Sequence, residues 1–151
     1  MDLEKYAFWF RDDRYVFISK GPKGKIEKAV RFYKVADEPF FQYSLSFGDW
    51  DERWGRINDR IVTNNGDRQK ILATVAAIVI DFTVGNSDAG VFATGSTPSR
   101  TRLYQMGIGM YYSVIAAVFE IQGLIRGVWE PFQKGRPYIA FFVKRKKSLI
   151  L

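Results

Sequence analysis

The stretch Phe92-Ala-Thr-Gly-Ser-Thr-Pro-Ser-Arg-Thr-Arg-Leu-Tyr-Gln-Met106 decides the fold prediction for this chain. The apolar residues Gly90–Ala93 predict a short buried strand, and Gly95 ends it. Thr97 can cap a helix through its hydroxyl, and Pro98 suits the first helical position because it has no N–H to lose. We therefore expect a strand, a tight turn and a helix beginning at Pro98.

The start of this helix is rich in polar and basic side chains. Ser96, Thr97, Arg100 and Arg102 lie close to backbone N–H groups that have no partner within the helix. Such free amides favour a bound anion. Two interpretations remain open: the arginines pair with carboxylates elsewhere in the fold, or they contact an anion such as a phosphate group.

The composition limits both the architecture and the chemistry. A chain of 151 residues predicts a single domain, here with a short basic tail from about residue 144. There is no cysteine and no histidine, which excludes disulfides, thiol catalysis, a Ser-His-Asp triad and most zinc or iron sites. Any catalysis must use carboxylates, tyrosine, lysine or backbone groups, and we expect no metal.

Location and charge give further expectations. The start of the chain lacks a signal peptide pattern and no apolar run could span a bilayer, so we expect a cytoplasmic protein that does not enter a membrane. The formal net charge is +7, with cations concentrated in Lys20–Lys28 and Lys144–Lys147. We interpret these runs as a solvated hairpin turn and a basic tail, with nucleic-acid contact as the alternative.

Apolar alternation and turn residues predict an α+β fold with a mixed, mainly antiparallel sheet. Its order is a three-strand meander, a helix, a strand, a second helix and two or three terminal strands. The expected strands are Tyr6–Phe10, Tyr15–Lys20, Ile26–Val35, Phe40–Phe47, Gly90–Ala93, Phe119–Ile125, Val128–Phe132 and Tyr138–Lys144, with Ile57–Val62 as a short extension.

Two helices complete this prediction. The first covers Arg68–Val84, capped by Asn65 or Asp67. Few charges interrupt either side of it, so we expect it to be buried on most sides. The second begins at Pro98 and is expected to continue through Ala116.

Three motifs resemble those of an uncharacterised bacterial family of about 150 residues. They are Asn65-Gly-Asp67 before the first helix, Thr94-Gly-Ser-Thr-Pro-Ser-Arg-Thr-Arg-Leu-Tyr104, and Trp129-Glu-Pro-Phe132 before Tyr138. The resemblance covers most of the chain and implies no mechanism, because the family has no assigned activity.

More loosely, the order of elements is similar to that of GCN5-related N-acetyltransferases. In that family, the loop from the fourth strand into the next helix holds the pyrophosphate of acetyl-CoA with backbone amides. The matching positions here are 63–69, which implies roles for Asn64, Asn65, Gly66 and Arg68. A tyrosine of the later helix often protonates the leaving thiolate, and Tyr104 matches it. The family's loop pattern is Gln/Arg-x-x-Gly-x-Gly/Ala, whereas this loop, Asn64-Asn-Gly-Asp-Arg68, has one glycine.

These observations support two main hypotheses. The first is an acyltransferase, or a degenerate relative, that binds acetyl-CoA, another acyl-CoA or a different phosphate-bearing ligand. Its cleft would lie between residues 63–68 and 96–104, with Tyr104 as proton donor and Asp49 or Glu52 as the base. The second is a basic, non-enzymatic module that binds nucleic acid or a protein partner, with base stacking on Trp50, Trp54 and Trp129. A structural homodimer is a third possibility.

Overall fold

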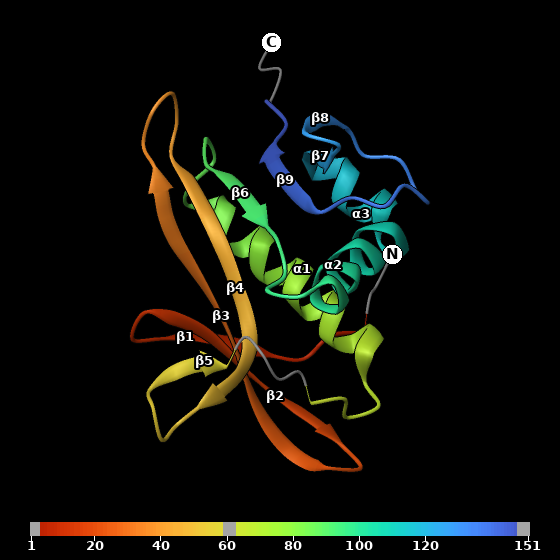
Figure 1. Cartoon of the computed structure of the whole chain (residues 1–151). Coiled ribbons are helices and arrows are strands. Elements are labelled where there is room, and N and C mark those ends of the chain that lie inside the picture. Colours follow the sequence, from red (N-terminus) through yellow and green to blue (C-terminus); the bar gives the residue numbers. More distant parts are fainter. Residues whose placement is uncertain (1–3, 59–62, 148–151) are drawn as a thin grey trace.

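A computed structural model describes residues 4–58 and 63–147 of the chain (Figure 1). Within this part, one sheet and three helices form an α+β fold. The elements are β1 Phe8–Arg11, β2 Arg14–Gly21, β3 Gly24–Ala36, β4 Gln42–Asp51, β5 Arg56–Asn58, α1 Arg68–Val84, β6 Gly90–Ala93, α2 Pro98–Met110, α3 Tyr112–Val118, β7 Phe119–Ile125, β8 Val128–Pro131 and β9 Ala140–Arg145.

The sheet is open, and its strands follow the order β1-β2-β3-β4-β6-β9-β7-β8, with β5 paired to β4 beside this path. In the described residues, β4 and β6 form the one parallel pair, over Gln42–Leu45 and Gly90–Ala93. All other pairings are antiparallel. The meander predicted from the sequence is therefore confirmed, and β4 continues to Asp51 beyond the end of its pairing with β6.

Helix α1 runs along one face of the sheet, and α2 lies beside it (Figure 1). Alternation along β2, β3 and β4 turns aromatic and β-branched residues towards α1, where they form one core cluster with the apolar stripe of the helix. A second cluster joins α1 to α3, β7 and β9. The predicted bounds of α1 and its extensive burial are both confirmed.

The second helix is shorter than expected. It does not continue through Ala116, because α2 ends at Met110 and a separate helix, α3, begins at Tyr112. Tyr111, between them, donates its N–H to the Gly107 carbonyl at 3.0 Å. Its hydroxyl donates to the Gln69 carbonyl in the first turn of α1 at 2.9 Å. This tertiary contact holds the residue at which the two helices separate.

Of the two expected caps of α1, Asp67 is the N-cap residue and Asn65 is not. Asp67 precedes the helix, but its side chain makes no capping hydrogen bond. One Asp67 carboxylate oxygen instead accepts hydrogen bonds from the hydroxyls of Tyr6 at 2.5 Å and Ser19 at 2.6 Å. Asn65 is buried, where it accepts from the Lys23 N–H at 2.8 Å and donates to the Gly24 carbonyl at 2.9 Å. Both side chains therefore tie the loop to the β2–β3 hairpin.

Candidate functional site

The two predicted ligand-binding segments face one cleft. A pocket of about 450 Å³ lies between the beginning of α1, the beginning of α2 and β4. It is lined by Phe47, Thr63, Asn64, Asn65, Asp67, Arg68, Ile71, Leu72, Thr97, Ser99, Arg100 and Leu103. The tertiary structure thus brings together two helix N-termini that are about thirty residues apart in the chain.

Arg100 is the central basic residue of this cleft. The residue is only 6% exposed, and its Nη2 donates a hydrogen bond to the main-chain carbonyl of Phe47. Its Nη1 is buried without a hydrogen-bond partner, and within residues 4–58 and 63–147 the guanidinium forms no ion pair. Burying a charge without a counter-charge is unfavourable, so this site favours an added anion.

The local backbone also prepares the cleft for an anion. Thr97 caps α2, since its hydroxyl oxygen accepts the Arg100 N–H at 3.3 Å, and Pro98 occupies the first helical position as predicted. At α1, Gly66 takes a φ of 74°, in the left-handed region, and donates its N–H to the Asn64 side chain at 3.0 Å. With no capping bond from Asp67, the first amides of α1 stay available to solvent or a ligand.

The Asp67 carboxylate beside the cleft accepts hydrogen bonds from Tyr6, which precedes β1, and from Ser19 on β2. Its bonds from Tyr6 and Ser19 engage one oxygen, while the other is buried without a partner in the described part of the chain. Burial, and then the hydrogen bond to Asp67, raise the pKa of the Tyr6 phenol. Tyr6 therefore remains a donor to Asp67 over a wide pH range. This network fixes the loop before α1, while the Asp67 carboxylate keeps its negative charge at the lining of the cleft.

A buried ion pair lies at the end of β4. Lys28 on β3 is paired in register with Asp49 on β4, and its fully buried ammonium contacts the Asp49 carboxylate. Lys28 also donates to the Thr63 carbonyl at 3.2 Å, and the Thr63 hydroxyl donates to the second Asp49 oxygen at 2.6 Å. The interpretation of Lys28 as part of a solvated turn is therefore wrong: it anchors the segment that leads into α1.

This pair bears on the two predicted base residues. Both carboxylate oxygens of Asp49 are engaged, by Lys28 and Thr63. Glu52 is exposed in the turn between β4 and β5 and is not among the residues that line the cleft. Their assignment as general bases stays a prediction.

Tyr104 and Ser96 line a second opening, next to the first. Where β6 ends and β4 continues, the strands leave a pocket of about 240 Å³ lined by Ser44, Leu45, Ser46, Phe47, Thr94, Gly95, Ser96, Arg100 and Tyr104. Arg100 and Phe47 line both openings, so the two are adjacent. Arg102 is exposed, donates to the Ser99 hydroxyl at 3.3 Å and lines neither opening.

Sequence reasoning missed Lys28 and the Phe47 carbonyl, whereas Thr63 lay within the predicted loop 63–69. Lys28 had a usable signal, because it continues the alternating series of Val30 and Phe32 on the inner face of β3. The Phe47 carbonyl had none, since only the meeting of β4 with α2 makes it a partner of Arg100.

The three tryptophans considered for base stacking do not form one platform. Trp50 on β4 lies under the Arg14 guanidinium, 3.5 Å from the ring centroid, and Trp54 follows in an exposed turn. Trp129 is on β8, which is separated from β4 in the strand order by β6, β9 and β7, and its ring contacts Phe92. In the described part of the chain, no helix is long and apolar enough to cross a bilayer.

The fold and site together define an α+β protein with an open cleft between two helix N-termini. The chain belongs to a family of unknown function (DUF6934), whose family model matches residues 2–146. No curated protein and no solved structure matches the chain. The predicted membership of an uncharacterised family is confirmed.

Proposed function

We propose that the cleft binds a phosphate-bearing small molecule, and that an acyl-CoA is the first ligand to test. One observation carries this proposal: the buried Arg100 guanidinium has an unpartnered nitrogen and no carboxylate partner among the described residues. A bound phosphate would supply a negative charge next to this guanidinium.

Two further features support an anionic ligand. The first turns of α1 and α2 line the same pocket as the Arg100 side chain, and helix N-termini attract phosphate. Arg68 in the first turn of α1 is exposed at this pocket and can reach a second anionic group. Arg68 on α1 and Arg100 on α2 therefore place one positive side chain at the beginning of each helix.

The strand arrangement supports the narrower choice of an acyl-CoA. Along the chain, α1 connects β4 to β6, and these two strands are parallel neighbours in the sheet. Helices α2 and α3 then connect β6 to β7, which pairs antiparallel with β9. This order is compatible with the resemblance to GCN5-related N-acetyltransferases, which assigns the pyrophosphate to residues 63–69. In an acyl transfer, a nucleophile attacks the thioester carbonyl, the thiolate leaves, and Tyr104 would give it a proton.

The proposal is tested by thermal unfolding in the presence of coenzyme A and acetyl-CoA at low and moderate salt. A ligand at about 100 times its dissociation constant adds roughly 2.7 kcal/mol to the free energy of unfolding. We expect this stabilisation in the natural chain and in Lys147→Ala, which removes an exposed cation of the basic tail. Arg68→Ala, which also removes one exposed cation, should lose most of it.

The same experiment separates the alternative function. Short RNA and DNA oligonucleotides are added in parallel, because a chain of net charge +7 can also bind nucleic acid. Stabilisation by oligonucleotides alone, decreasing steeply with salt, would support the basic binding module and overturn the small-molecule proposal. Equal loss of the coenzyme A effect in Arg68→Ala and Lys147→Ala would show that the cleft is not the site.

A further inference from the structure

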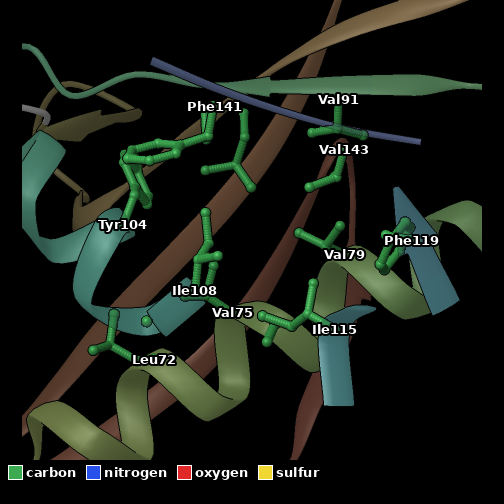
Figure 2. Close-up of a pocket in the computed structure, with 14 residues that line it drawn as sticks. Leu72, Val75, Val79, Val91, Tyr104, Ile108, Ile115, Phe119, Phe141 and Val143 are labelled. Atoms are coloured by element: carbon green, nitrogen blue, oxygen red, sulfur yellow. The ribbon is translucent and has the colours of Figure 1, made fainter. Parts of the chain in front are cut away.

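An apolar cavity lies behind the cleft, between α1, α2, α3 and the sheet (Figure 2). Its volume is about 80 Å³, and fourteen side chains or backbone positions line it, nearly all of them aliphatic or aromatic. In Figure 2, Tyr104 from α2 lies at one end of this lining and Phe119 from β7 at the other. Apolar cavities of this kind stay dry and accept apolar molecules.

A small pocket lies between the cavity and the cleft. It shares Phe47, Leu72, Arg100 and Leu103 with the cleft. It shares Leu72 and Tyr104 with the cavity, together with Val75. The Arg100 guanidinium and the apolar cavity therefore lie on two sides of one small pocket, whose lining includes Tyr104.

We infer that the ligand of the cleft carries a short aliphatic group, which enters the apolar cavity beside Tyr104 while its phosphate contacts Arg100. This inference rests on the proposed function and names the chemical class of its ligand: a phosphate-bearing head with an aliphatic tail. An engineered cavity of about 150 Å³ binds benzene, so about 80 Å³ holds a chain of about three or four carbons.

The test measures dissociation constants by calorimetry for methyl, n-propyl, n-butyl and n-octyl phosphate, because Arg100 and the cavity border the same small pocket and the chain must begin next to the phosphate. Burying one methylene changes affinity about fourfold, so n-propyl phosphate should bind about 15-fold more tightly than methyl phosphate. The n-octyl ester should gain nothing beyond n-butyl phosphate, because the cavity is too small for it. Coenzyme A and butyryl-CoA form a second series, in which the long pantetheine arm separates the phosphate from the acyl group, so a gain with acyl length only there would overturn the contact of the phosphate with Arg100.

Two variants fill the cavity without touching the cleft. Ala76→Leu on α1 adds three carbons to the lining, and Ala93→Val on β6 adds two if the first variant does not fold. Both should bind inorganic phosphate as the natural chain does and lose the increase in affinity from methyl phosphate to n-butyl phosphate. The matched control is Ala117→Leu, at an exposed position of α3 outside the lining, which should keep the full chain-length dependence.

The outcomes separate this inference from the proposed function. If coenzyme A binds but neither series gains affinity with chain length, the phosphate site stands and the aliphatic tail is overturned. If the gain persists in the filled variants, the tail binds elsewhere and the cavity assignment is overturned. If no thioester and no alkyl phosphate binds, the proposed function itself fails and the inference fails with it.

Discussion

The guanidinium of Arg100 at the beginning of α2 donates a hydrogen bond to the main-chain carbonyl of Phe47 on β4. The two residues are 53 positions apart, and Phe47 lies beyond the point at which β4 stops pairing with β6. Arg100 thus joins the first turn of a helix to a stretch of β4 that pairs with β3 but not with β6, and no carboxylate of the described residues forms an ion pair with it. We therefore expect a substitution of Arg100 to affect the free energy of unfolding and ligand binding differently.

Replacing Arg100 by methionine should change stability little and binding strongly. The variant loses a charge-assisted hydrogen bond of about 1.5–3 kcal/mol but also removes the cost of an unpaired buried charge, which is several kcal/mol. We therefore expect the free energy of unfolding in urea to stay within about 1 kcal/mol of the natural value or to rise. Stabilisation by coenzyme A should disappear.

Arg102→Met is the control for this prediction, because Arg102 is exposed in the same helical turn and lines neither opening. It should change neither stability nor binding. A loss of more than about 3 kcal/mol in Arg100→Met would instead identify Arg100 as one half of a structural pair.

Breaking the ion pair of Lys28 and Asp49 should lower stability strongly, in contrast to the replacement of Arg100. Removing one partner of a buried pair leaves an uncompensated charge and costs about 3–5 kcal/mol. Lys28→Met alone should therefore lower the free energy of unfolding by about that amount, and Asp49→Leu should do the same. The double variant Lys28→Met/Asp49→Leu should cost much less than the sum, since an apolar pair replaces the ionic one.

Urea denaturation of the natural chain, both single variants and the double variant gives the coupling energy directly. Lys20→Met is the control, because this lysine is exposed on the same hairpin. Additive costs in the double variant would mean that the two side chains do not depend on each other.

Gly95 should not tolerate a side chain. A Cβ atom at this position would lie 2.3 Å from the backbone nitrogen of Thr101 and 2.6 Å from the carbonyl carbon of Arg100, so α2 would have to move. We expect Gly95→Ala to lower the free energy of unfolding by about 1–3 kcal/mol and to weaken ligand binding.

Gly109 provides the matched substitution near the end of α2. A Cβ there meets no atom within 4 Å, so Gly109→Ala should stabilise the helix by about 0.5–1 kcal/mol. Both variants are compared by thermal and urea unfolding. If Gly95→Ala is as stable as Gly109→Ala, the turn between β6 and α2 is looser than the structure indicates.

Tyr15 should make stability sensitive to alkaline pH. Burial, and then its hydrogen bond to Asp81 at 3.0 Å, raise the pKa of the Tyr15 phenol to about 12, against about 10 in an unfolded chain. The folded state therefore holds this proton more tightly, so the contribution is complete below pH 10 and is lost as the pH rises towards 12.

Unfolding free energies between pH 8 and 12 test this sign. Tyr15→Phe should lose less stability than the natural chain over the interval from pH 10 to 12. Tyr33→Phe, at an exposed position of β3, should follow the natural chain. A steeper loss in Tyr15→Phe would contradict the direction of the pKa shift.

Local signals in the sequence predicted most of the elements because they act within a few residues. The apolar stripe and uncharged flanks of residues 68–84 gave α1 its observed bounds, and the strands 90–93 and 119–125 were also predicted with their observed bounds. The break at Tyr111 was not predicted, because the Tyr111 hydroxyl contacts Gln69, which is 42 residues away in the chain.

The sequence by itself determined the fold class, the capped beginning of α2 at Pro98 and the basic residues that stand there. It could not decide that residues 63–68 and 96–100 share a cleft, since that depends on β4 and β6 pairing in parallel with α1 between them. It left open whether Arg100 meets a carboxylate. Only the tertiary structure decided that Arg100 is buried against the Phe47 carbonyl while Asp49 is taken by Lys28. Burial and charge pairing depend on residues distant in the chain, which short-range patterns do not encode.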